Sequence, residues 1–406
     1  MQEHLAGAGL DKNFKLDMIK LFLIILTLAF WAGQTMSLNL GIGIRIIPLD
    51  LAVGLFGLWN LLHLNYKDRV GYWHIFGSFV AVAVLSLVWQ IGKLNITQVF
   101  ASSMYLVRFG FYSLLFTIFS QPIFAKWGKL LLLINGLGVA AISFFQLFLY
   151  PNLRNLSYLG WDPHQYRIFS TFLDPNFTGI ILVLTLFLGF ELLRQNKHTN
   201  MLLHRFVFLA LGLAFIALLF TYSRGSYIAF LFGVFVWLMF KRKVKLFLLI
   251  GALFISLLFF LPKPDGEGVN LLRTISVEAR WKNNLEAINL WRTSPLIGVG
   301  FNTLRFVRTE AFGETQARSG AGFHNSWLYL LAATGILGLM SYSMIWQKII
   351  INKIKGKLFS EKNTLFLASL TAVAVHSLFD NSLFYPAVMY FGFILAGSLS
   401  SDHSGL

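Results

Sequence analysis

Apolar residues are gathered into long segments along most of this chain. A helix needs about 20 mostly apolar residues to cross the hydrocarbon core of a bilayer. Twelve segments have roughly this character, at residues 17–33, 44–64, 71–90, 99–120, 128–150, 176–193, 204–221, 224–240, 244–261, 326–346, 363–380 and 383–399. The pattern predicts an all-α polytopic membrane protein with about 12 transmembrane helices. We expect residues 1–406 to form one integral membrane domain.

The distribution of Lys and Arg predicts the orientation, because cytoplasmic loops carry an excess of both. With the N-terminus placed in the cytoplasm, the inner segments hold 19 of the 33 basic residues. Eight of the 13 outer ones fall in a single long loop, to which the charge rule does not apply. Both termini are therefore predicted to be cytoplasmic. The first apolar segment lacks a small-residue cleavage site, so we interpret it as a retained helix.

Composition narrows the class further. Hydrophobic residues make up 57% of the chain and charged residues only 12%, whereas soluble proteins average about 25% charged. A soluble enzyme and a disordered chain are both excluded. The absence of cysteine excludes disulfides, thiolate catalysis, iron–sulfur clusters and cysteine-based zinc sites. The net charge of +16 fits cytoplasmic anchoring first and anionic substrates second. No long basic polar segment points to nucleic acid.

Two predicted outer segments, residues 151–175 and 262–325, are longer than simple connections. Long loops in compact proteins are usually functional, so we expect the second to be the large catalytic loop. Within it, helical periodicity predicts an amphipathic helix from about Ser276 to Arg292 that lies along the outer membrane interface. Its apolar positions are Val277, Trp281, Leu285 and Ile288.

Arginine is concentrated in the outer segments. A planar guanidinium binds two phosphate oxygens at once, which an ammonium group does not do. The outer lysines are only Lys93, Lys263 and Lys282. The outer arginines include Arg154, Arg167, Arg224, Arg273, Arg280, Arg292, Arg305, Arg308 and Arg318. This bias predicts a phosphate-bearing substrate on the outer face.

Arg224 is the most informative single residue, because it lies between two apolar helices joined by almost no loop. A charge at that depth is costly unless it is satisfied. Substrate binding is the functional interpretation, and an arginine extended toward lipid headgroups is the alternative. Arg280, one turn before Asn284 on the amphipathic helix, has the same two interpretations, ligand binding or an exposed helix face.

Three further positions adjoin predicted helix starts. His324 and Asn325 open the span after the long loop, where a histidine is commonly a cap or a packed ring. Arg167 lies near the end of the first long loop. Asp174 or Asn176 is expected to cap the following helix, with Pro175 in its first turn.

Other polar residues give weaker signals. His376 and Asp380 are four residues apart, so on one helix they share a face and either pair or help to bind a sugar. Arg108 and Asp50 are candidates for a buried ion pair. No outer spacing of His and carboxylates indicates a metal site, and we expect neither metal nor cofactor.

Four motifs in order resemble a known family. They are Arg167 with Thr-Phe-Leu-Asp-Pro-Asn176, Tyr-Ser-Arg-Gly225, Arg280-Trp281 with Ser294-Pro-Leu-Ile-Gly-Val-Gly300, and His324-Asn325 with Thr334-Gly-Ile-Leu-Gly338. This arrangement resembles the superfamily of O-antigen ligases and polymerases, the C-type glycosyltransferases of the bacterial envelope. The resemblance covers about residues 165–345.

The resemblance implies transfer of a polysaccharide from undecaprenyl diphosphate to an acceptor sugar, on the outer face of the inner membrane. It implies no nucleotide and no metal. The family's essential residues match Arg224, Arg280 and His324, which are therefore the predicted catalytic residues. The predicted substrate contacts are Arg167, Asn325, Trp281, Arg318, His376 and Asp380.

Three functions stay open at this point. A ligase would move finished polysaccharide to a glycolipid such as a lipid A core, and the single loop of about sixty residues favours it. A polymerase would use a second lipid-linked repeat as acceptor, and it should then have a second outer arginine cluster. A transporter or flippase is disfavoured, because transporters place polar groups near the midplane and here only Arg108 is predicted to lie deep.

Overall fold

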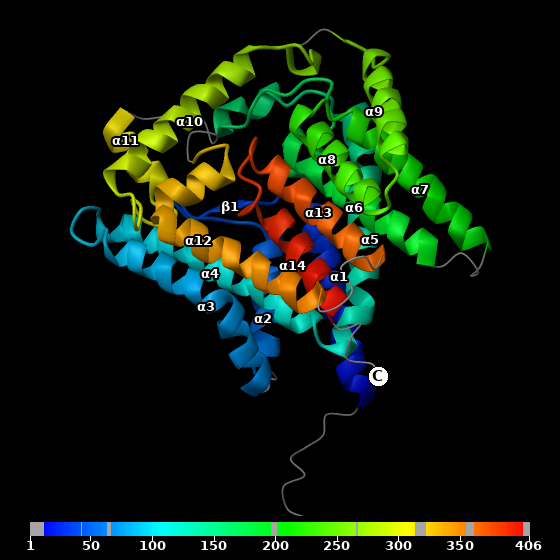
Figure 1. The fold of residues 1–406 in the computed structure, drawn as a ribbon. Coiled ribbons are helices and arrows are strands. Elements are labelled where there is room, and N and C mark those ends of the chain that lie inside the picture. The colour runs from blue at the N-terminus through cyan, green and yellow to red at the C-terminus, as the bar shows by residue number, and fades with distance from the viewer. Residues whose placement is uncertain are drawn as a thin grey trace, which may run out of the picture.

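The computed structural model describes residues 12–41, 43–62, 66–195, 201–264, 267–312, 322–354 and 361–400. These residues form a bundle of α-helices with one short hairpin of two strands (Figure 1). The strands are β1 (Leu38–Asn39) and β2 (Arg45–Ile46), paired antiparallel. The helices are α1 (Lys12–Ala32), α2 (Pro48–Leu61), α3 (Tyr66–Val88), α4 (Ile96–Phe119), α5 (Pro122–Leu149), α6 (Pro175–Gln195), α7 (Met201–Leu219), α8 (Arg224–Phe240), α9 (Val244–Phe259), α10 (Ile275–Thr293), α11 (Leu304–Phe312), α12 (Ser326–Ile354), α13 (Glu361–His376) and α14 (Pro386–Ser400).

Each of the twelve predicted apolar segments overlaps one of these helices. Among the described residues, five helices, α3, α4, α5, α6 and α12, are long and apolar enough to cross a membrane. Six others, α2, α7, α8, α9, α13 and α14, are apolar but shorter. The helical, membrane-type architecture is therefore confirmed, while the number of spans stays a prediction.

Helix α14 lies at the centre of the bundle and supplies much of its core. Tyr390, Phe391, Ile394 and Ala396 are fully buried, and α14 contacts α4, α5 and α6. Its neighbour α13 packs closely along α8, where Gly233 lies beside the backbone of Ala368. Small residues let two helix backbones approach in this way. The close packing brings the end of α13 against the start of α8.

Helix α12 is broken at Gly335, whose φ of 66° and ψ of −169° are accessible essentially only to glycine. The segment after α10 fills the break. Pro295 accepts a hydrogen bond from the amide of Ile336 at 2.9 Å, and Val299 donates to the carbonyl of Ala332 at 2.9 Å. A Cβ on Gly335 would lie 2.2 Å from the backbone of Leu296. The motifs at residues 294–300 and 334–338 therefore pack against each other and fix the end of α10 against α12.

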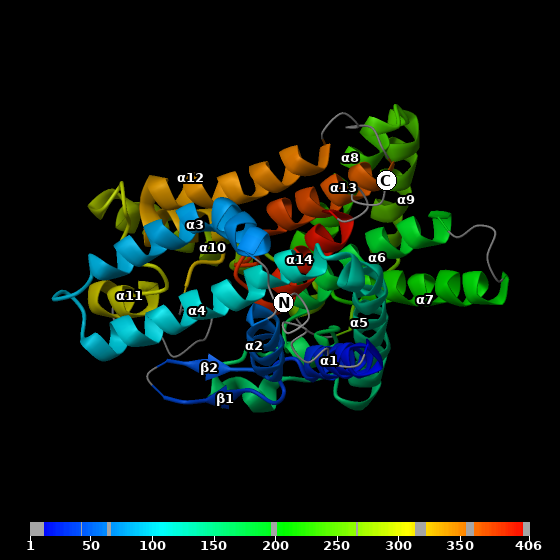
Figure 2. The ribbon, with the colours of Figure 1, turned by 90° about the horizontal axis from the view of Figure 1, so that it is seen from below.

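The long connections gather at one end of the bundle. Among the described residues, this loop end consists of 33–41, 43–47, 150–174, 260–264, 267–312 and 322–325, with α10 and α11 lying near the start of α12 (Figure 1). Seen from below, the hairpin projects beyond α2 toward the side where α4, α10 and α11 lie (Figure 2). The 3₁₀ turns of residues 154–159 and 170–172 shape the middle connection. Helices α7 and α9 lie on the opposite side of the molecule from α11 (Figures 1 and 2).

We expect the loop end to face the outside of the cell. Because the chain has no cysteine, single cysteines report topology cleanly. A cysteine replacing Leu272, which is 87% exposed, should react with a membrane-impermeant maleimide in intact spheroplasts. Lys245 is exposed and lies at the start of α9, whereas Leu272 lies in the connection that follows the end of α9. A cysteine replacing Lys245 should react only after the membrane is permeabilised. The reverse labelling pattern would overturn the predicted orientation. Position 266, within the predicted outer loop, lies outside the described residues.

Candidate functional site

A cavity of about 710 Å³ opens among the connections of the loop end. Ligand pockets commonly measure about 300–1,000 Å³. Its walls come from residues 160–177, the start of α10, the start of α11, the segment before α12 and the segment after α13, with Tyr105 of α4 and Tyr329 of α12. The polar side chains that line this loop-end cavity are Tyr105, Asp162, His164, Arg167, Asp174, Asn176, Arg273, Ser276, Arg280, Asn302, Arg305, His324, Tyr329, Asp380 and Asn381.

One wall of the cavity carries a cluster of Asp380, Arg280 and His324, which we call the Asp380 cluster. Arg280 Nη2 lies 3.3 Å from Asp380 Oδ2, and His324 Nδ1 lies 3.7 Å from Asp380 Oδ1. The carboxylate side chain is only 5% exposed, whereas those of Arg280 and His324 are 23% and 32% exposed. A buried carboxylate therefore holds two groups that still reach the cavity.

The backbone around Asp380 explains why the carboxylate is placed there. Asp380 lies in the segment between α13 and α14, and its carbonyl accepts a hydrogen bond from Ser326 Oγ at 3.0 Å. Asn176, at the start of α6, donates to Asp380 Oδ1 at 3.4 Å. Three elements far apart in sequence thus fix one carboxylate. An isolated buried carboxylate would be costly, so Arg280 also stabilises the fold.

His324 is held between α10 and the start of α12. Its backbone amide donates to Asn283 Oδ1 at 2.9 Å. Asn325 is the N-cap of α12, because its Oδ1 accepts from the amides of Trp327 and Leu328. The cap directs the Asn325 side chain into the helix end and leaves His324 at the cavity.

Arg224 begins α8 and ties it to the large loop. Its guanidinium donates to the carbonyls of Leu271 and Arg273 and, at 2.7 Å, to Ser276 Oγ. Arg224 is not among the residues that line the cavity. Its hydrogen bonds position the start of α10, on which Arg280 lies.

Arg167 supports the turn from which Arg224 projects. Its Nε donates to the carbonyl of Thr221 at 2.9 Å, and its Nη2 donates to that of Tyr222 at 3.2 Å. Tyr222 has a φ of 49°, a left-handed conformation that is costly outside glycine. Burial lowers the pKa of Arg167 to about 9, so it stays charged at neutral pH. The predicted substrate contact borders the cavity mainly as a brace for this turn.

The spacing of His376 and Asp380 suggested that their side chains pair, but the hydrogen bond between the two residues is a backbone one, from the amide of Asp380 to the carbonyl of His376 at 3.1 Å. His376 is fully buried, and its two ring nitrogens meet Ser226 Oγ at 3.2 Å and Ser382 Oγ at 2.6 Å. The reason is local, because α13 ends at His376 and the turn that follows brings Ser382, and not the Asp380 carboxylate, to the imidazole ring. His376 joins α13 to α8, while Asp380 turns to the cavity.

The other predicted residues include some that lie away from the cavity and one pair that forms as expected. Trp281 is 65% exposed and does not line the cavity. Arg318 lies outside the described residues. The predicted pair of Arg108 and Asp50 is present, with Arg108 Nη2 2.7 Å from Asp50 Oδ2. Cavity residues that the sequence did not single out include Arg305, Arg273, Asp162, Tyr105 and Tyr329.

Asp174 caps α6 as expected, since its Oδ1 accepts from the amides of Asn176 and Phe177. Burial, and then the carboxylates of Asp380 and Asp162, raise the pKa of Asp174 to about 7. A raised pKa in the folded state means that the native state binds the proton more tightly than the unfolded chain. The stabilisation is therefore present at acidic pH and is lost as pH rises through about 7.

Asp174→Asn should remove this pH dependence, because the amide oxygen keeps the cap without the charge. We expect the variant to melt at a higher temperature than the parent at pH 8.5, with the difference shrinking toward pH 5.5. Thermal unfolding in detergent at both pH values measures it. The matched control is Glu278→Gln, an exposed carboxylate on α10. A difference that does not change with pH would contradict the raised pKa.

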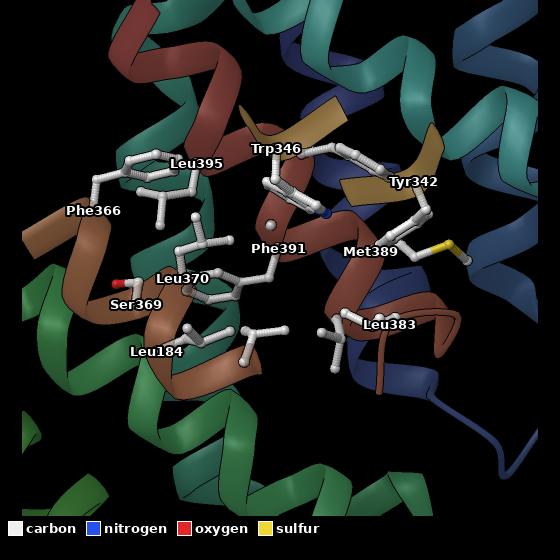
Figure 3. Close-up of a pocket in the computed structure, with 14 residues that line it drawn as sticks. Leu184, Tyr342, Trp346, Phe366, Ser369, Leu370, Leu383, Met389, Phe391 and Leu395 are labelled. Carbon is white, nitrogen blue, oxygen red and sulfur yellow. The ribbon is translucent and has the colours of Figure 1, made fainter. Parts of the chain in front are cut away.

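A second, much smaller cavity of about 30 Å³ lies among α6, α12, α13 and α14 (Figure 3). Its lining is almost entirely apolar, with Leu184, Leu370 and Phe391 directed into it and Trp346 above (Figure 3). Ser369 supplies a hydroxyl group, and the lining includes no charged side chain. Charge-dependent chemistry is therefore expected in the loop-end cavity and not here.

The fold and the loop-end cavity define a helical membrane-type protein with basic, acidic and imidazole groups gathered in one site. Residues 209–343 match the protein family described as O-Antigen ligase. The matched region runs from α7 into α12 and contains Arg224, Arg280 and His324. The resemblance seen in the sequence motifs is thereby confirmed, and it indicates an enzyme of the ligase or polymerase type of glycosyltransferase. No curated protein matches the chain.

Proposed function

We propose that this protein is an O-antigen ligase-like glycosyltransferase, which moves a polysaccharide from undecaprenyl diphosphate to a sugar hydroxyl. The observation that carries the proposal is the Asp380 cluster. One buried carboxylate brings a phosphate-binding type of side chain, Arg280, and an acid–base side chain, His324, into the same cavity. Transfer from a lipid diphosphate needs both kinds of group.

Arg280 binds the donor diphosphate in this proposal, together with Arg273 on the same wall. When the bond between the anomeric carbon and the diphosphate oxygen breaks, the electron pair leaves with the diphosphate. Fixed guanidinium groups stabilise that charge without reorganising, which is how preorganised donors accelerate a reaction. Arg224 orders the loop before α10 and adds positive charge beside Arg280. Arg167 in turn braces the Arg224 turn.

His324 acts as the general base. With Nδ1 toward Asp380, the carboxylate favours the tautomer that carries the proton on Nδ1. Nε2 is then free to accept the proton of the acceptor hydroxyl. The hydroxyl oxygen attacks the anomeric carbon opposite the departing diphosphate, so the configuration is inverted. Diphosphate is a good leaving group, and the step requires neither a metal nor a cofactor.

The reaction would take place at the outer face of a bacterial inner membrane, with the lipid tail of the donor in the bilayer. The acceptor is a glycolipid or glycan, of the lipid A-core type if the protein is a ligase. A polymerase, in which a second lipid-linked repeat is the acceptor, is the second candidate. Arg305, which also lines the cavity, and the neighbouring Arg45 favour an acceptor that itself carries phosphate.

Purified protein supplied with a lipid-diphosphate oligosaccharide and candidate acceptors tests the proposal. We expect a new glycosidic bond, release of lipid diphosphate and an inverted anomeric configuration by NMR. The rate should be unchanged by a chelator. Arg280→Lys should lower turnover about tenfold or more, whereas the matched control Arg292→Lys, at an exposed position on the same helix, should not. Absence of transfer to every acceptor, or product with retained configuration, would refute the proposal.

A further inference from the structure

A second pair of arginines, which we call the Arg305 pair, lies where the hairpin meets the start of α11, on other elements than α10, which carries Arg280. It consists of Arg305, at the start of α11, and Arg45, on β2. Arg305 lines the cavity with Tyr105, Asn302 and Trp161. The guanidinium of Arg45 lies 5.9 Å from the centre of the Trp161 ring. Arg305 and Trp161 thus line the cavity, and Arg45 lies against Trp161 without being one of the lining residues.

The hairpin is built to hold Arg305 in place. The carbonyl of Gly43 accepts hydrogen bonds from Arg305 Nη1 and from Tyr105 Oη. Gly43 has a φ of 77°, and a Cβ there would overlap the Arg305 guanidinium. A glycine is therefore required on both conformational and steric grounds. The close approach of this backbone keeps the Arg305 side chain extended along the hairpin.

A buried ion pair anchors the hairpin from beneath. Arg108 on α4 donates to the carbonyl of Arg45 and pairs with Asp50 on α2 at 2.7 Å. Tyr112 donates to the other Asp50 oxygen at 3.0 Å. Arg108 is thus occupied by Asp50 and by the hairpin backbone, and the Arg45 guanidinium lies over Trp161, which lines the cavity. The Arg305 pair is a supported arrangement and not two unrelated surface side chains.

Electrostatics favours an anion between the two arginines. Burial lowers the pKa of Arg45, Tyr105 raises it, and the positive charge of Arg305 lowers it. Holding two like charges together is unfavourable, and a bound phosphate relieves it through bidentate hydrogen bonds. Trp161 supplies the ring against which the Arg45 guanidinium lies.

The position of His324 relates the two basic regions. The preceding residue, Phe323, packs beneath Arg308 of α11, whose guanidinium lies 4.9 Å from the ring centre. His324 itself reaches Asp380, the partner of Arg280. The histidine therefore lies between α11 and the proposed donor site. An acceptor bound at the Arg305 pair would therefore approach His324 from the side of α11, and not from the side of the proposed donor site at Arg280.

We propose that Arg305 and Arg45 bind a phosphate or diphosphate group of the acceptor glycolipid. The inference rests on the proposed function, because it assigns the acceptor half of the same cavity. The shared chemistry is a phosphorylated acceptor, which is supplied either by a second lipid-diphosphate-linked glycan or by a phosphorylated core glycolipid. A neutral glycan acceptor would have no use for this pair of charges.

The experiment compares three acceptors that carry the same terminal sugar: a lipid-diphosphate glycan, a phosphorylated core glycolipid and a phosphate-free oligosaccharide. The parent should show the lowest KM for one of the two phosphorylated acceptors, and which one identifies the source. Arg305→Gln and Arg45→Gln should raise that KM roughly tenfold or more, toward the value for the phosphate-free acceptor. The donor KM should stay unchanged. Arg292→Gln should leave all three acceptors unaffected.

Arg45→Gln keeps the inference testable if Arg305→Gln disturbs the hairpin, since Arg45 holds Arg108 through its backbone carbonyl. Equal losses on phosphorylated and phosphate-free acceptors, or a rise in the donor KM, would overturn the inference. So would a parent enzyme that prefers the phosphate-free acceptor. The proposed function fails separately, if the parent transfers no glycan at all.

Discussion

His324→Ala should lower glycan transfer by roughly 10²–10⁴-fold, the range typical for loss of a general base. The backbone amide of His324, and not its ring, contacts Asn283, and Asn325 caps α12. The variant should therefore insert, purify and melt much like the parent. It should also bind the lipid-diphosphate donor normally, because Arg280 is untouched. The transfer rate, donor affinity and melting temperature are measured on one preparation.

His164→Ala is the matched control, since His164 also lines the cavity but lies beside Arg167 rather than Asp380. Its transfer rate should fall much less. His376→Ala should behave differently again, because the buried ring links Ser226 to Ser382, and its loss should lower the melting temperature. Full transfer by a well-folded His324→Ala protein would remove the general-base role and leave catalysis to the arginines.

The helices were predictable because hydrophobic periodicity is a local property of the chain. Each of the twelve apolar segments overlaps a helix, and the predicted amphipathic helix at Ser276–Arg292 is α10, at Ile275–Thr293. The Asp174 cap and the Arg108–Asp50 pair were predictable for a similar reason. The Asp174 cap depends on a motif only four residues long. The Arg108–Asp50 pair follows because a buried charge requires a partner of opposite charge.

The orientation of α10 was open, because periodicity identifies an apolar stripe without saying what it faces. The stripe with Val277 and Trp281 is 52% and 65% exposed at these two positions. The opposite side, with Ala287 and Leu290, packs against residues near the start of α12. An exposed apolar stripe fits the predicted place at the membrane interface, which stays a prediction.

The Asp380 cluster was not predictable as a unit. Asp380 is 100 residues from Arg280 and meets it only through the packing of α10, α12 and α13. The sequence offered a nearer partner, His376, because it treated residues 363–380 as one helix. In the structure α13 ends at His376, so Asp380 lies in the turn that follows the helix and its side chain faces the cavity. Hairpin strands of two residues and α11, with its short apolar face, likewise carry too little local signal.

Arg280→Lys should lower transfer by about tenfold or more, which corresponds to about 1.4 kcal/mol of lost transition-state binding per factor of ten. Lysine keeps the positive charge and so still compensates buried Asp380. It loses the planar fork that holds two phosphate oxygens at once. We therefore expect near-parental melting temperature with reduced kcat. Arg280→Ala is a poorer test, because it leaves the carboxylate unpaired and so lowers stability as well.

Arg292→Lys makes the same exchange on the same helix at an exposed position, and it should leave transfer unchanged. Asp380→Asn separates the two functions of the cluster. It removes the charge that orients both His324 and Arg280, so transfer should fall while the Arg280 fork survives. If the fork matters, Arg280→Lys and Asp380→Asn combined should be worse than either alone. Normal turnover in Arg280→Lys at equal expression would show instead that charge suffices, and that the diphosphate is held by a point charge and not by a two-pronged contact.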